Sequence, residues 1–167
     1  MKAIIVHTPF SWKRPLTIVS WLIRKFTKTY YNHAAFIVTI DHNEFVLEAD
    51  MKGVILIPLK DWVKEQIVTV YKIPKSYRAK AMSKVGNTKY DFASLLFYGL
   101  INTLTGKYYG YTDERKAAER FYCYEYLAWV LGISKWYSIL PNPFKQWADS
   151  NLKLEFEKIS AKNLLEK

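Results

Sequence analysis

The chain has 167 residues, a formal net charge of +10, and a composition that is 50% hydrophobic and 17% aromatic. Such a chain is expected to fold as one domain around its own core, so a mainly disordered protein is excluded. The single cysteine cannot form an internal disulfide, which also excludes the small, cross-linked secreted proteins.

The first half of the chain predicts mainly β-structure. The segment AIIVHT reads as a short strand, and apolar residues at helical spacing then predict a helix over residues 15–28. Three strands follow, separated by the turn-forming segments DHNE and MKG. The segment KDWVKEQ predicts a brief helix and IVTVYKI a further strand. The three strands are predicted in HAAFIVTI, EFVLEAD and GVILIPL.

Beyond Pro74 the pattern becomes helical. Three helices are predicted, then a short fourth helix and an extended segment that would lie beside the sheet. The segments are, in order, KSYRAKAMSKVG, DFASLLFYGLINTL, AAERFYCYEYLAWVLG, NPFKQWADS and LKLEFEKI. Strands first and helices second predict an α+β fold, with a small antiparallel sheet packed on a helical layer. We expect one domain over residues 1–160 and a C-terminal tail at 161–167.

The positive charge is concentrated in two stretches. Residues 1–40 and residues 71–89 each contain six Lys or Arg and no acidic residue. Such stretches suit an anionic partner, either a membrane surface or an acidic wall polymer, or else form a solvated basic face. Nucleic acid is the less favoured partner, because the aromatic segment KYYGYTDERK is expected in a loop rather than on a sheet.

The N-terminal segment MKAIIVHTPF has too short an apolar run for a signal peptide. Arg24 and Lys25 end the most lipophilic stretch before it is long enough to cross a membrane. We therefore expect a cytoplasmic protein, which cell lysis or peripheral membrane contact could bring to other surfaces.

His33 and Glu48 are predicted on the same face of two adjacent strands. His33 begins its strand, where a neutral imidazole is well placed as a general base, although it could also simply cap the strand end. If the connecting turn centres on His42 and Asn43, Glu48 faces Ile37 and lies roughly 13 Å along the ladder from His33. The shared face is therefore predicted, whereas a contact between the two side chains is not.

Cys123 is the candidate nucleophile. A thiolate is favoured at a helix N-terminus or beside an imidazolium. Residues 114–131 could form one helix with Cys123 at its centre, or a helix could begin near Phe121 and favour catalysis. His7 and His42 are weaker candidate bases. No zinc-ligand spacing and no phosphate- or dinucleotide-binding glycine motif is present, so we expect neither a metal nor a cofactor.

The motifs NHAAFIV, FVLEAD, GVILIPLKDWV, GNTKYDFASLL, FYCYEYLAWVL and LPNPFKQW occur in this order over about residues 5–147. In this arrangement the chain resembles the circularly permuted papain-like branch of the NlpC-type superfamily, and within it the YiiX-like proteins. The resemblance implies a Cys123–His33 pair, Glu48 as the third polar residue, and Tyr90 near the oxyanion or substrate. Two positions depart from the family pattern. Tyr124 replaces a small residue and could narrow the pocket or pack outward, and Asn32 replaces a serine.

The resemblance implies a cysteine hydrolase that cleaves an amide or ester bond without a cofactor. The favoured substrate is a peptide of the cell-wall type. One alternative is an acyl lipid at an anionic membrane, and another is a binding module that keeps the fold with an idle thiol.

Overall fold

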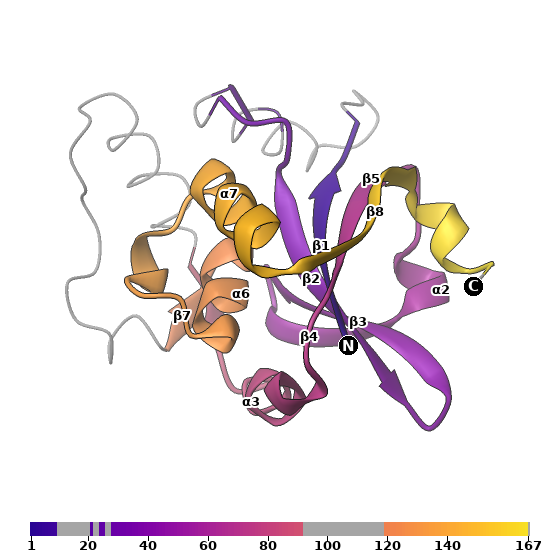
Figure 1. Ribbon diagram of the computed structural model, residues 1–167. Helices are drawn as coiled ribbons and strands as arrows, with labels where there is room; N and C mark the ends of the chain where they lie inside the picture. The colour runs from indigo at the N-terminus through magenta and orange to yellow at the C-terminus, as the bar shows by residue number, and fades with distance from the viewer. Residues whose placement is uncertain (10–20, 22–23, 26–27, 92–118, 167) are drawn as a thin grey trace.

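Strands rich in apolar residues form a six-stranded, fully antiparallel sheet with the order β4-β3-β2-β1-β5-β8. The computed structural model describes residues 1–9, 21, 24–25, 28–91 and 119–166, and it shows an α+β fold (Figure 1). The strands are β1 (Lys2–His7), β2 (His33–Ile40), β3 (Asn43–Asp50), β4 (Gly53–Pro58), β5 (Ile67–Lys72) and β8 (Lys153–Ser160). A separate parallel pair is formed by β6 (Lys89–Tyr90) and β7 (Arg120–Phe121).

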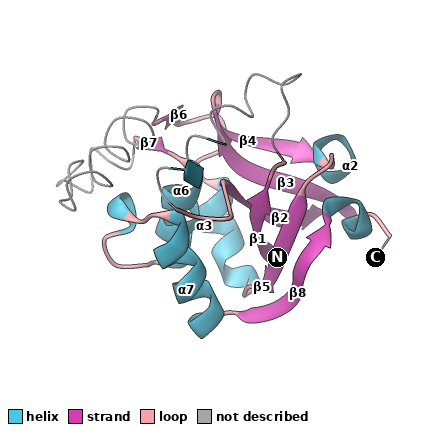
Figure 2. Ribbon diagram, turned by 90° about the horizontal axis from the view of Figure 1, so that it is seen from above, coloured by secondary structure: helices cyan, strands magenta, loops and turns pink. Residues whose placement is uncertain are grey.

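The described helices are short, and they lie on both faces of the sheet (Figure 2). The α-helices are α2 (Leu59–Trp62), α3 (Arg78–Met82), α6 (Cys123–Leu131) and α7 (Pro141–Asn151). The 3-10 helices are η1 (Lys75–Tyr77), η3 (Trp136–Ser138) and η4 (Ala161–Leu164). None of the helices in the described part of the chain is long and apolar enough to cross a membrane.

Strand alternation divides the core into two clusters. Ala3 and Ile5 of β1 face a cluster that includes the buried residues of α6 and α7. Ile4 and Val6 face the opposite cluster, which contains buried residues of α2 and η4. Successive strand residues point to opposite faces, so a sheet covered on both sides needs apolar residues at consecutive positions. The run AIIV in β1 meets this need.

The six strands of the main sheet and most of the described helices lie where the sequence predicts them, whereas β7 lies in a segment predicted to be helical. The helix predicted in KSYRAKAMSKVG is shorter, consisting of η1 and α3. Of the helix predicted over residues 15–28, the described positions Trp21, Arg24 and Lys25 are helical, and Lys28 lies in a turn with φ 49°. The helix predicted over residues 91–104 lies outside the described residues except for Asp91, which is not helical, and the aromatic segment at 107–116 lies outside them entirely.

The predicted C-terminal tail is partly built into the core. Ala161 and Leu164 of η4 are buried in the cluster that contains Val6 and Trp62. The main-chain N–H of Ala161 donates to the carbonyl oxygen of Gln66 at 2.9 Å. Residues 161–164 therefore cover one face of the sheet.

Gly53 brings the turn between β3 and β4 against the segment that leads to β6. It has φ +99°, and a Cβ added there would lie 1.9 Å from the carbonyl oxygen of Thr88. The Thr88 hydroxyl accepts the N–H of Val54 at 3.3 Å, and the N–H of Gly86 donates to the Val54 carbonyl at 2.9 Å. Only glycine permits this approach, which fixes the chain just before Tyr90.

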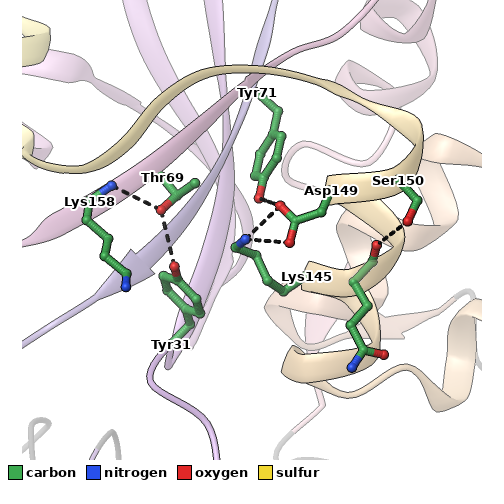
Figure 3. A network of polar contacts seen from close by, with 8 residues as sticks. Tyr31, Thr69, Tyr71, Lys145, Asp149, Ser150 and Lys158 are labelled. Carbon is green, nitrogen blue, oxygen red and sulfur yellow. Dashed lines mark hydrogen bonds and ion pairs between the residues drawn. The ribbon is translucent and has the colours of Figure 1, made fainter.

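Polar contacts attach α7 and β8 to the sheet (Figure 3). The Tyr71 hydroxyl donates to Asp149 at 2.6 Å, and Lys145 pairs with the same carboxylate at 2.6 Å. On β8, the N–H of Lys158 donates to the buried hydroxyl of Thr69 at 3.3 Å. Lys158 lies at a register shift between β5 and β8 and has φ 49°, which identifies a β-bulge.

Candidate active site

Cys123 is the first residue of α6. The strand β7 ends at Phe121, and the extended Tyr122 is the N-cap residue of the helix. The side chain of Glu125 accepts the N–H of Tyr122 at 3.2 Å, and the N–H of Asp91 donates to the carbonyl oxygen of Phe121 at 3.1 Å. The chain is therefore extended while it pairs with β6 and through Tyr122, and the helix begins at the next residue, Cys123. Of the two helices that the sequence allows, the structure has the one that places Cys123 at the N-terminus.

His33 and Glu48 are in direct contact. The His33 Nε2 atom lies 2.6 Å from Glu48 Oε2. The predicted register is wrong, because the turn between β2 and β3 consists of Asp41 and His42 and the strands pair Ile37 with Val46. Continuing this register places Glu48 opposite Ala35, two residues from His33 instead of four. Asp41 and His42 adopt the left-handed conformation with φ 46° and 64°, which a two-residue hairpin requires.

Trp62 contacts the same carboxylate oxygen as His33. Its indole Nε1–H donates to Glu48 Oε2 at 2.9 Å. Burial alone would raise the pKa of Glu48, but the positive charge of His33 and the hydrogen bonds from His33 and Trp62 outweigh burial and lower it. Glu48 is thus an ionised, oriented carboxylate.

His33 also interacts with Cys123. Burial opposes the imidazolium charge, but the Glu48 carboxylate and the Cys123 side chain attract it and hydrogen-bond to it, and the pKa of His33 is raised well above 6.5. The imidazole of His33 therefore interacts with both a carboxylate and the side chain of the cysteine.

Tyr124 ties the cysteine helix to the histidine strand. Its side chain is buried, packs edge-on against Phe144 with ring centroids 5.6 Å apart, and donates its hydroxyl to the carbonyl oxygen of His33 at 3.1 Å. It therefore does not pack outward. The bulky residue at this position links the backbones that carry the two reacting groups.

Two buried carboxyl groups belong to residues close to the start of α6. Glu125 and Asp91 are both buried, and they interact electrostatically. Burial raises the pKa of Glu125 well above 4.5, and the nearby Asp91 and Cys123 add to this effect. A neutral Glu125 can accept the Tyr122 N–H without placing a second negative charge beside the sulfur.

The other residues that the sequence analysis named are not part of the contacts among His33, Glu48 and Cys123 described above. The main chain of Tyr90 forms β6 beside β7, while its side chain lies outside the described part of the structure. His7 ends β1 and His42 lies in the turn after β2, as predicted. Asn32 is buried and accepts the N–H of Thr8 at 2.7 Å, so it fixes the chain before His33.

Sequence reasoning did not find the roles of Trp62 and Tyr124. Trp62 lies in a short predicted helix, and nothing in the linear sequence shows that its indole faces β3. Tyr124 is conspicuous as a large residue after the cysteine, but its hydrogen bond depends on how α6 packs on β2. In both cases the only indication in the sequence is the residue type, because a buried tryptophan N–H or tyrosine hydroxyl needs a hydrogen-bond acceptor.

No protein-family model and no curated protein sequence matches this chain. Among the residues that the structure describes, no group of His, Cys, Asp and Glu is arranged to hold a metal ion. A thiol, an imidazole and a carboxylate that interact can supply a nucleophile, a proton donor and an orienting charge.

Proposed function

We propose that this chain is a cysteine hydrolase that cleaves an amide or ester bond, with the permuted papain-like arrangement that the motif order implies. One observation supports this most strongly. His33 interacts with both Glu48 and Cys123, and Cys123 is the first residue of α6. A structural cysteine in an apolar core requires neither a charged imidazole nor a helix N-terminus.

In the first half of the reaction, the Cys123 thiolate attacks the carbonyl carbon and a C–S bond forms. The C–N or C–O bond then breaks, and His33 transfers its proton to the leaving nitrogen or oxygen. Water attacks the resulting thioester while neutral His33 accepts its proton. The C–S bond breaks, releasing the acid and restoring the imidazolium and thiolate.

Glu48 keeps the imidazole ring oriented through both halves. Its contact with Nε2 leaves Nδ1 to exchange the proton. The N–H of Cys123 is the candidate donor to the oxyanion, because N–H groups in the first helical turn have no acceptor within the helix. Tyr90 is proposed as a second donor, on the basis of the family resemblance.

The favoured substrate remains a peptide amide of the cell-wall type, which the resemblance implies. A second candidate is the acyl group of a lipid. It is favoured by exposed aromatic and basic side chains at the end of the sheet where His33 lies, described below. Both substrates present a carbonyl carbon to the thiolate, so the same mechanism applies to each.

The test is to trap the acyl-enzyme. The folded protein is incubated with activated peptide amides and with activated acyl esters, and the peptide containing Cys123 is examined by mass spectrometry. We expect an acyl adduct on Cys123 in the native protein and none in the His33→Ala variant. An adduct that forms equally in both proteins, or no adduct with either substrate class, would contradict the proposed hydrolase and favour a binding module.

A further inference from the structure

Five residues that precede β2 in the chain, together with Lys158 of β8, form what we term the aromatic–basic cluster. It combines two aromatic rings with four basic groups. Its members are Trp21, Arg24, Lys25, Lys28, Tyr30 and Lys158.

Tyr30 is held in place although its side chain is exposed. Its ring stacks on His7 with centroids 3.9 Å apart and planes 8° from parallel. The His7 Nδ1–H donates to the Tyr30 carbonyl at 2.6 Å, and Arg24 Nη1 lies 3.1 Å from Nδ1 and 3.2 Å from Nε2. Burial lowers the pKa of His7 and the Arg24 charge adds to this effect, although the hydrogen bond to the Tyr30 carbonyl opposes it.

Two lysines lie over the exposed rings. Lys25 Nζ is 4.8 Å from the centroid of Trp21, and Lys158 Nζ is 5.6 Å from that of Tyr30. Lys158 reaches Tyr30 from the β-bulge, where its N–H is bonded to Thr69 (Figure 3). The bulge therefore directs a cation of β8 toward a ring that precedes β2.

The cluster is exposed and positively charged. Trp21 is 40% exposed and Tyr30 is 44% exposed. None of the four basic side chains forms a salt bridge with a carboxylate of the described residues. Exposed tryptophan and tyrosine beside lysines combine apolar area with positive charge, a combination that suits the headgroup region of an anionic bilayer.

We propose that the aromatic–basic cluster docks the protein on an anionic lipid surface. Trp21 and Tyr30 enter the headgroup region, and the four basic side chains contact lipid phosphates. A soluble polyanion would use the charges but would gain little from two exposed rings.

The same end of the sheet carries the candidate active site. Val6 pairs with His33, and Tyr30 precedes His33 by three residues. A bilayer bound at the cluster would therefore lie near the histidine end of the site. The docking itself does not depend on the proposed hydrolase activity, so either can fail without the other.

The test measures sedimentation of the full chain with vesicles of phosphatidylcholine, with and without phosphatidylglycerol. The charge variant is Lys25→Glu with Lys158→Glu. Its matched control is Lys75→Glu with Arg78→Glu, which changes the net charge equally on exposed residues that follow the opposite end of β5. Because a basic residue near an anionic surface contributes about 1 kcal/mol, we expect at least about tenfold weaker binding for the charge variant. The control should bind within about threefold of the native protein.

A third protein, Trp21→Ser with Tyr30→Ser, separates lipid from other polyanions. At high salt, we expect the native protein to stay bound to the vesicles and this variant to lose its binding. The affinity of the variant for soluble polyphosphate should equal that of the native protein. Circular dichroism establishes that each variant is folded, and vesicle-bound native protein should retain the reactivity of Cys123. Equal losses in the charge variant and its control, or no effect of removing the rings, would overturn the proposal. So would a failure of the native protein to bind anionic vesicles.

Discussion

The Tyr124 hydroxyl donates to the carbonyl oxygen of His33, so a partly buried hydrogen bond joins the helix of the nucleophile to the strand of the base. A neutral hydrogen bond of this kind contributes about 1 kcal/mol to stability. Its effect on chemistry can be larger, because the bond aligns two reacting groups. α6 contains a second buried tyrosine, Tyr126, whose hydroxyl donates to the Ala81 carbonyl at 2.8 Å away from the site.

We predict that Tyr124→Phe lowers the rate of Cys123 alkylation at about pH 6 roughly fivefold, since the loss of about 1 kcal/mol allows misaligned conformations. Tyr126→Phe should lose a similar free energy of unfolding and keep the native rate. Iodoacetamide labelling followed by mass spectrometry measures the rates, and urea denaturation measures the stabilities. Indistinguishable rates for the two variants would show that Tyr124 has only a structural role.

At the residue level, the sequence predicts which residues share a face of the sheet better than it predicts which side chains touch. Alternation along the strands correctly places His33 and Glu48 on one face. Whether they touch depends on the turn, and Asp41 and His42 form a two-residue turn without the glycine that usually marks one. The indole of Trp62 reaches Glu48 from a separate helix, a contact that no local pattern contains.

Among the elements, the turn between β3 and β4 has a stringent steric requirement. We predict that Gly53→Ala lowers the free energy of unfolding by at least about 3 kcal/mol, because the new methyl group would meet the Thr88 carbonyl and the backbone has a positive φ. The control is Gly86→Ala, where φ is +72° but no atom lies within 4 Å of the added Cβ. It should lose only about 1 kcal/mol.

Urea denaturation of both glycine variants provides the comparison. Similar losses would mean that the contact with Thr88 does not constrain the turn. The expected difference would show that Gly53 fixes the segment leading to β6, and hence the pairing that ends at Cys123.

The bounds of helices and strands are also hard to predict where they depend on contacts between residues distant in sequence. Period-two alternation makes the strands recognisable, and apolar runs mark those buried on both faces. The start of α6 is different, because residues 114–131 are compatible with a longer helix. The helix begins at Cys123 in a setting where Phe121 pairs with Tyr90, a partner distant in sequence. Non-local pairing of this kind leaves no periodic signal.

For the whole molecule, the site should couple stability to pH. The raised pKa of His33 contributes stability that is complete below about 6.5, its unfolded value, and is lost as pH rises through the folded pKa. The lowered pKa of Glu48 contributes stability that is complete above about 4.5 and is lost as pH falls through the folded pKa. The pair therefore stabilises the fold most between these two values.

We predict that the difference in unfolding free energy between the native protein and the double variant His33→Gln with Glu48→Gln is largest between about pH 4.5 and 6.5. It should decline on each side, because each group contributes this stability only while it carries its charge in the folded protein. Urea denaturation across this range measures it, and the comparison cancels titrating groups common to both proteins. A difference independent of pH would contradict the charged pair.

The most direct test of the proposed site is the pH dependence of Cys123 alkylation by iodoacetamide in the folded protein, measured beside His33→Ala. With an imidazolium next to the sulfur, we expect the native rate to be nearly constant from about pH 6 upward. In His33→Ala the rate at about pH 6 should fall at least about tenfold and then increase toward alkaline pH, as for an ordinary thiol. Parallel curves for the two proteins, or a native Cys123 that reacts only after unfolding, would contradict the cysteine–histidine pair.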